Sequence, residues 1–371
     1  MPAIKTALVH DWLVSHAGAE KVLESIHSLF PGPIHTLVHD SGNVNAWPVV
    51  YTSFLQKIPY ATSLYRHLLP LFPLAIEQFD LGSYDLVLSS SHAVAKGVLT
   101  HTEQLHICYC HTPMRYAWDL YHPYLSKVKG IKKPVAKMAL HYLRHWDSTS
   151  TSRVDHFIAN SNCVARRIKK IYQRDAKVIH PPVATHHFFL DDKEDFYLTV
   201  SRLVPYKRVD LIVEAFAAMP EKKLLVVGNG PEMSAIKKKA KGNIELLGAL
   251  PDEHMRKLMA QAKAFVFAAE EDFGIAPVEA QAAGTPVIAF GRGGVLETVV
   301  EGVTGLFFSE QTISSLSEAI QHFDRIQHQF IPEHIQEHAG QFSEERFKQE
   351  YRDFVSNRYK EFHENRYPCW R

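Results

Sequence analysis

Short runs of β-branched and aliphatic residues alternate with longer helical patterns along most of the 371-residue chain, and this alternation constrains the fold most. It is typical of parallel sheets whose strands are joined by crossover helices. The pattern predicts strands at residues 6–10, 84–90, 106–111, 156–160, 196–201, 223–228, 244–247, 264–269, 286–290 and 305–308. The predicted class is therefore α/β.

A change in composition divides the chain near residue 182. Pro181 and Pro182 bar a helix, and the acidic run 191–195 follows them. At roughly 150 residues per domain, the length agrees with two to three domains. We expect a Rossmann-like domain at 1–182, a second at 183–342, and a terminal crossover helix at 343–371 that returns to the first domain. Such a chain places its ligand beyond the strand ends, in a cleft between the two domains.

Overall charge and cysteine content exclude several classes of protein. A formal net charge of +1 provides no field that would recruit nucleic acid. The four cysteines, Cys108, Cys110, Cys163 and Cys369, are too scattered for a disulfide framework. No secretion signal and no run of about 18 uncharged apolar residues occurs, so we expect a cytoplasmic protein.

Two acids flank the start of a predicted helix in the segment 264–294. A buried strand runs into an acidic turn with Glu271, then Gly274, then an apolar helix that carries Glu279. Free backbone N–H groups at such a helix start bind anions, and a carboxylate accepts hydrogen bonds from a vicinal diol. Sugar nucleotides offer both groups. The alternative is that the acids merely cap the helix and face solvent.

Two cations and a histidine follow other predicted strands. Arg202 and Lys207 come after the strand 196–201 and suit a diphosphate, the alternative being a solvated basic loop. His111 lies where the strand 106–111 is broken by Thr112-Pro113. A zinc site of this histidine with His106 and the nearby cysteines is the alternative there, but the spacing matches no closed zinc pattern.

The acidic segment resembles the signature of the retaining glycosyltransferases of family four, which have the two-Rossmann GT-B fold. The matching positions are Glu271, Phe273, Gly274, Glu279, Ala280, Ala282, Gly284, Pro286 and Val287. The resemblance implies that Glu271 contacts hydroxyls of the donor hexose and Glu279 the ribose. It also implies that backbone around Phe273, Gly274, Ile275 and Ala276 holds sugar and phosphate.

The same resemblance extends to the other motifs. It implies that Arg202 and Lys207 neutralise the leaving diphosphate and that His111 hydrogen-bonds the hexose. Further donor contacts are expected at Gly18, Gly228, Gly230 and Leu250. The family often has Gly where Arg208 stands, which leaves the shape of that loop in question. The string His-Thr-Pro-Met-Arg-Tyr from residue 111 resembles a bacterial mannosyltransferase-like branch of O-antigen and exopolysaccharide assembly.

The predicted function is a retaining hexosyl transfer from a nucleotide-diphosphate sugar, of UDP-glucose or GDP-mannose type, to a hydroxyl of a polysaccharide or lipid-linked acceptor. We expect no metal and no cofactor, because side chains supply the cations. The alternatives are a nucleotide-sugar-binding partner subunit without turnover and a GT-B epimerase. A dinucleotide oxidoreductase is disfavoured, since no Gly-x-Gly-x-x-Gly follows a strand.

A local basic surplus indicates where an acceptor or membrane binds. Residues 121–175 contain twelve Lys or Arg against three Asp, and the region 127–146 mixes lysines with apolar residues as interfacial helices do. We expect peripheral contact with the inner face of a membrane there, a solvated helix face being the alternative. The candidate acceptor residues are Ser90, Ser91, His92, Arg115, Tyr116 and Trp118.

Overall fold

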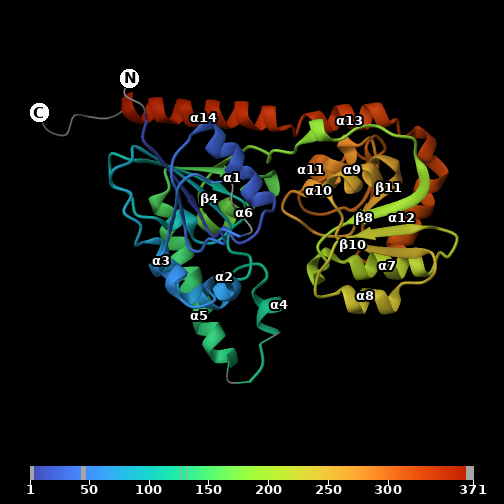
Figure 1. The fold of residues 1–371 in the computed structure, drawn as a ribbon, viewed down its shortest axis with the longest axis horizontal. Helices are drawn as coiled ribbons and strands as arrows, with labels where there is room; N and C mark the ends of the chain where they lie inside the picture. The colour runs from blue at the N-terminus through green and yellow to red at the C-terminus, as the bar shows by residue number, and fades with distance from the viewer. Residues whose placement is uncertain (1–3, 43–46, 127, 131, 365–371) are drawn as a thin grey trace, which may run out of the picture. The chain divides into compact units, whose positions relative to one another are not determined.

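The computed structural model describes residues 4–42, 47–126, 128–130 and 132–364. The chain divides into two compact units, which Figure 1 traces by colour along the sequence. The first consists of the residues up to Pro181 together with those from Phe347 onward, and the second of Pro182–Arg346. The second unit is therefore inserted between two stretches of the first.

The first unit contains a seven-stranded sheet of order β3-β2-β1-β4-β5-β6-β7, in which every described pair is parallel. Its strands are β1 (Thr6–His10), β2 (Ile34–Thr36), β3 (Val50–Thr52), β4 (Leu86–Ser91), β5 (Leu105–Cys110), β6 (His156–Ala159) and β7 (Ala176–Val178). Its helices are α1 (Gly18–Leu29), α2 (Ala61–Leu64), α3 (Phe72–Ile76), α4 (Tyr121–Ser126), α5 (Lys132–Thr149) and α6 (Asn162–Tyr172). Most of α14 (Glu344–Glu364) also belongs to it.

Alternate residues of the first sheet pack against helices on opposite faces, as the two-residue period of a strand requires. One face packs against α1 and α14, where Phe347, Tyr351 and Val355 share a core cluster with Leu8 and Tyr109. The other face packs against α2, α3, α5 and α6. Because both faces are covered, its central strands read as nearly continuous apolar runs.

The second unit contains a six-stranded parallel sheet of order β10-β9-β8-β11-β12-β13. Its strands are β8 (Glu194–Val200), β9 (Leu224–Val227), β10 (Ile244–Gly248), β11 (Ala262–Phe267), β12 (Val287–Phe290) and β13 (Gly305–Phe308). Its helices are α7 (Val209–Ala217), α8 (Met233–Lys239), α9 (Asp252–Gln261), α10 (Ile275–Ala282), α11 (Val295–Thr298), α12 (Ile313–Ile326) and α13 (Pro332–Gly340). Helices α7, α8 and α12 pack on one face and α9, α10 and α11 on the other.

The predicted α/β class with two Rossmann-like sheets and a returning terminal helix is confirmed. Strands β2, β3 and β7, each three residues long, were not predicted. The sequence from Pro251 onward predicts a helix with Asp252 as its capping residue, and this is wrong: α9 begins at Asp252 itself, and Pro251 is the capping residue. Asp252 instead places its charge in the first turn, where the helix dipole favours it.

The basic region expected to contact a membrane corresponds largely to α5. Lys132, Lys133 and Lys137 are exposed there, together with Val135 and Met138, which are 66% and 74% exposed. Lys127, Cys369 and the end of the predicted terminal helix, 365–371, lie outside the described residues. No helix in the described part of the chain is both long and apolar enough to cross a bilayer.

Candidate donor site

An ion pair between Lys207 and Glu271 forms the centre of the candidate site in the second unit. Lys207 ends a short 3₁₀ helix, Pro205–Lys207, after β8, and Glu271 lies in the turn after β11. Strands β8 and β11 are paired in parallel, so their carboxyl ends share one edge of the sheet. Each side chain keeps 20% of its surface exposed. Two of the predicted site residues therefore meet at the edge where parallel sheets bind ligands.

The local electrostatics of Lys207 are unusual for a lysine. Burial and the neighbouring Arg202 guanidinium lower its pKa to about 8. The Glu271 carboxylate opposes this lowering of the Lys207 pKa, because a paired anion favours the ammonium form. Arg202 is exposed and donates a hydrogen bond to the Tyr206 hydroxyl at 2.7 Å.

The backbone of Glu271 is fixed by two glycines. Gly294 N donates to Glu271 O at 2.8 Å. A Cβ on Gly293 would lie 2.3 Å from the same oxygen, and Gly293 has a φ of +80°. The turn after β11 can therefore approach the loop after β12 this closely only because residue 293 is glycine.

Helix α10 begins directly after this turn. Gly274 precedes it with a φ of +88°, a backbone conformation that residues other than glycine rarely adopt. Ile275, Ala276 and Glu279 are half-buried on α10. Phe273 is buried against Phe342, with ring centroids 5.7 Å apart, so a ligand can reach it only through its backbone.

The backbone at Arg208, where the family often has Gly, determines the shape of the loop after β8. This residue precedes α7 in the left-handed conformation, with a φ of +54°. Glycine adopts that conformation without steric cost. Arg208 adopts this conformation here, and its side chain contacts Gln311 and Asp210.

Gly228 and Gly230 have a packing role at the end of β9. A Cβ on Gly228, whose φ is +130°, would lie 1.9 Å from Ser201 O, and one on Gly230 would lie 2.2 Å from Leu203 O. The loops after β8 and β9 therefore pack backbone against backbone, with Leu203 N donating to Asn229 O at 2.9 Å. Leu250, the third expected contact of this group, is half-buried beside the core cluster of α9.

In the first unit, half-buried His111 is linked through the buried Ser90 hydroxyl to the buried His10. Ser90 Oγ is 2.8 Å from His111 Nε2 and 3.2 Å from His10 Nδ1, and His10 Nε2 lies 3.9 Å from Glu20 Oε1. Burial lowers the pKa of His111 to about 3, helped by the neighbouring His92 and His10. His111 is therefore neutral at physiological pH, and Ser90 fixes the orientation of its ring.

Asp11, a residue that the sequence patterns did not single out, organises the end of β4. It is fully buried and accepts hydrogen bonds from four successive backbone N–H groups, those of residues 92–95, at 2.6–3.0 Å. Although burial opposes ionisation, His92, His10 and these N–H groups hold its pKa below the ordinary value. The signal in the sequence was its position directly after the first strand.

Gly18 is the first residue of α1, and Glu20 closes the helix start by accepting from Ala17 N at 2.9 Å. Among the acceptor candidates, Ser90 and Ser91 are buried, and His92 Nδ1 lies 3.1 Å from Asp11. The rest are dispersed: Arg115 pairs with Asp119, Trp118 Nε1 donates to Asp147, and the Tyr116 hydroxyl is buried.

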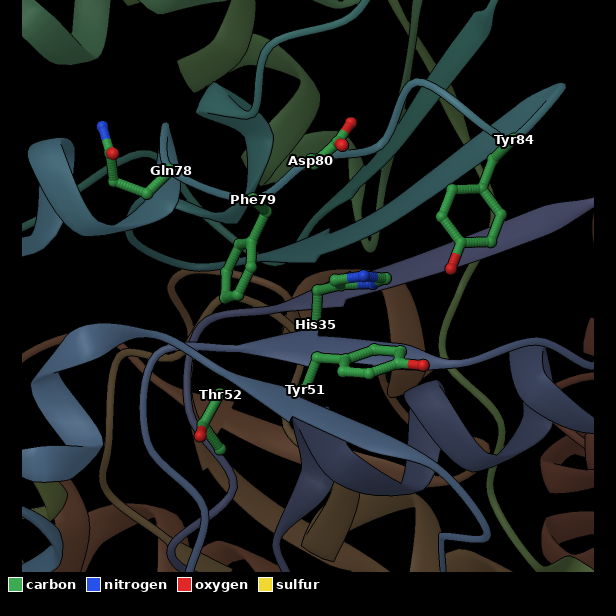
Figure 2. A pocket seen from close by; sticks show the side chains of 7 residues that line it. All are labelled: His35, Tyr51, Thr52, Gln78, Phe79, Asp80 and Tyr84. Atoms are coloured by element: carbon green, nitrogen blue, oxygen red, sulfur yellow. The ribbon is translucent and has the colours of Figure 1, made fainter.

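A cavity of about 310 Å³ lies elsewhere in the first unit, over β2 and β3. It is lined by His35, Tyr51, Thr52, Gln78, Phe79, Asp80 and Tyr84. Figure 2 shows the His35 ring over the Tyr51 ring, and their centroids are 5.1 Å apart. None of the predicted site residues lines this cavity.

The zinc alternative receives no support from the side-chain contacts of β5. His106 is fully buried, with one ring nitrogen 2.8 Å from Ser89 Oγ and the other 2.9 Å from Arg153 O. Cys108 and Cys110 pack in the core cluster against α6. A group with the donor atoms for a metal, within the described residues, is His186 with Glu344 and Glu345, whose ligand atoms lie within 4.8 Å of one another.

Comparisons with known proteins gave matches to a family model and to solved structures. Residues 186–333 match the family model described as "Glycosyl transferases group 1", a stretch that lies within the second unit and includes Arg202, Lys207, Glu271 and Glu279. The structure of Anabaena Alr3699/HepE in complex with UDP has a TM-score of 0.72 at 18% identity, covering 95% of this chain and 100% of that one. The structure of WaaG, a glycosyltransferase involved in lipopolysaccharide biosynthesis, has a TM-score of 0.65 at 15% identity, covering 94% and 99%. The fold is that of GT-B glycosyltransferases.

Curated relatives match over shorter stretches. The GDP-mannose-dependent monoacylated alpha-(1-6)-phosphatidylinositol monomannoside mannosyltransferase of Corynebacterium glutamicum is 37% identical over 135 residues, 32% of this chain and 35% of that protein. The D-inositol 3-phosphate glycosyltransferase of Mycobacterium tuberculosis is 30% identical over 200 residues, 46% of this chain and 41% of that protein. The chain thus spans less than half the length of the curated relatives it matches.

Proposed function

We propose that this chain is a glycosyltransferase that moves a hexose from a nucleotide-diphosphate sugar to a hydroxyl of a saccharide acceptor. The observation that carries the proposal is the meeting of Lys207 with Glu271 at the carboxyl edge of β8 and β11, where α10 begins. A cation, a carboxylate and a helix start together suit a diphosphate joined to a polyol. The family-model match over 186–333 supports it.

The proposed roles follow from the chemistry of each group. Arg202, Lys207 and the N–H groups at the start of α10 stabilise the charge that develops on the leaving diphosphate. Glu271 accepts hydrogen bonds from the hexose and Glu279 from the ribose. His111, neutral because of its lowered pKa, hydrogen-bonds the hexose as an uncharged group.

The donor is proposed to be of UDP-glucose or GDP-mannose type. The names of the relatives support both, since one curated relative is GDP-mannose-dependent and the Anabaena protein was solved with UDP-glucose. A thermal-shift panel of nucleoside diphosphates and their sugars tests this, because a ligand at 100 times its Kd adds about 2.7 kcal/mol of stability. Hexose transfer from the stabilising donor confirms the function, and a panel in which nothing stabilises the protein refutes it.

We propose that the transfer retains the anomeric configuration. Glu271 and Glu279 are committed to hydroxyl contacts with the donor, and neutral His111 is a weak base. The leaving diphosphate oxygen then takes the acceptor proton on the same face of the hexose. Proton NMR of the first product decides this, and an inverted anomeric coupling constant would contradict it.

We also propose that the reaction is independent of metal ions and cofactors, since Arg202 and Lys207 supply the positive charge. EDTA should leave the rate unchanged. A rate that collapses with the chelator and recovers with Mg²⁺ or Mn²⁺ would overturn this assignment.

The acceptor is proposed to be a polysaccharide or a lipid-linked saccharide of O-antigen or exopolysaccharide type, met at the cytoplasmic face of a membrane. The exposed Val135, Met138 and lysines of α5 support contact with anionic lipid. Sedimentation with vesicles containing phosphatidylglycerol tests it, and equal binding of the wild type and Lys133→Glu/Lys137→Glu would refute it.

A further inference from the structure

Glu271 and Lys207 satisfy each other before any ligand binds. Their ion pair is mostly buried, since each side chain has only 20% of its surface exposed. On the proposed function, Lys207 binds the diphosphate and Glu271 binds the hexose. Each partner must therefore weaken or exchange this contact when the donor enters.

The geometry restricts the exchange to side chains. Glu271 O is held by Gly294 N, and Gly293 leaves no room for the backbone to retreat. Lys207 N donates to Val204 O at 3.0 Å within its own loop. The Glu271 carboxylate moves off Lys207 by side-chain rotation.

Whether that rotation is favourable depends on what the ligand offers. A free nucleoside diphosphate brings two to three negative charges to Lys207 and gives Glu271 no new partner, so carboxylate and phosphate repel each other at one cation. A nucleotide sugar brings the same phosphates together with hydroxyl donors for Glu271. Hydrogen bonds from the hexose hydroxyls to Glu271 then replace the lost ion pair with Lys207.

We propose that Glu271 determines the specificity of this site: by competing for Lys207, it makes the site prefer the intact sugar donor over the free nucleoside diphosphate. This inference rests on the proposed function. After transfer, Glu271 returns to Lys207 and promotes release of the diphosphate product. The carboxylate thus acts against product inhibition as well as in binding the hexose.

Isothermal titration calorimetry with UDP and GDP tests the proposal. Glu271→Gln removes the charge and keeps the shape, and we expect it to bind the cognate nucleoside diphosphate about tenfold more tightly, in line with the cost of juxtaposed like charges. The same variant should bind the intact sugar donor more weakly. The two affinities then change in opposite directions, as competition of Glu271 for Lys207 requires.

Two matched variants separate the local effect from general electrostatics. Glu270→Gln removes the same charge from the exposed neighbouring residue and should change the affinity less than twofold. Glu279→Gln should weaken nucleoside diphosphate binding through the ribose. Unchanged thermal unfolding of Glu271→Gln shows that the variant is folded.

Each outcome has one meaning. Equal or weaker binding of the nucleoside diphosphate by Glu271→Gln, with a wild type that binds it, overturns the competition and leaves the proposed function intact. Equal tightening in Glu270→Gln and Glu271→Gln also overturns it, because the effect is then not specific to the pair. Absence of UDP and GDP binding in every variant refutes the proposed function itself.

Discussion

Arg202 and Lys207 lie on one short loop, and both are expected to act on a single leaving group. Replacing either by Ala should lower turnover by about a hundredfold or more, the range seen when a donor to transition-state charge is lost. Steady-state kinetics with the cognate donor measure this. Lys257→Ala, on an exposed part of α9, is the control. Near-normal turnover in both site variants would contradict their roles.

Ser90 is expected to position His111 rather than to touch the substrate. Ser90→Ala removes the hydroxyl that lies between His111 and His10. A small misplacement of a reacting group can lower the reaction rate by about a hundredfold. We expect kcat to fall by at least tenfold. Ser90→Thr, which keeps the hydroxyl, should recover much of it.

The pH profile separates positioning from a general loss of structure. The pKa of His111 is about 3, so its charge does not change between pH 6 and pH 9. The loss in Ser90→Ala should therefore be the same across that range. A loss confined to one side of neutrality would show that His111 titrates during the reaction.

At the scale of elements, Gly228 and Gly230 let the loops after β8 and β9 touch. Gly228→Ala and Gly230→Ala place a methyl within 1.9 Å and 2.2 Å of backbone oxygens. Each should lower the free energy of unfolding by about 2 kcal/mol or more. Gly242→Ala has open space around its Cβ and serves as the control. Urea unfolding that is indistinguishable among the three would refute this packing role.

The strands that could be predicted from the sequence are those that are buried on both faces. Strands such as β8 and β11 are long apolar runs because they are buried on both faces. By contrast, β3 and β7 are three-residue strands at the sheet edges, too short to give a period. The same holds for the candidate site: Glu271 and Lys207 could be predicted because they follow strands with a clear apolar pattern. Asp11 acts on residues more than 80 positions away, a contact that no local spacing reveals.

At the scale of the whole molecule, histidines with lowered pKa make the first unit the acid-sensitive part. Within the described residues, these are His27, His35, His92, His106, His111 and His156, all in the first unit. Burial is the first cause in each case. Their unfolded pKa is near 6.5, so below it the unfolded chain takes up protons that the folded unit does not. Stability is complete above pH 6.5 and is lost as pH falls toward about 4 and 3, the pKa values of His106 and His111.

Tryptophan fluorescence can follow this loss selectively, because none of the five tryptophans lies between residues 182 and 346. On going from pH 7 to pH 5, the thermal transition seen by fluorescence should fall further than the transition of the second unit seen by circular dichroism. Parallel shifts in the two signals would contradict the uneven distribution of buried histidines.

The insertion of the second unit between two stretches of the first also determines the order in which the molecule is completed during synthesis. Residues 182–346 are contiguous and have all their core partners once they leave the ribosome. The first unit begins earlier and finishes later, since Phe347, Tyr351 and Val355 of α14 cover one face of its sheet. That apolar face stays partly open while nearly half of the chain is still being translated, which makes the first unit the segment most in need of chaperones.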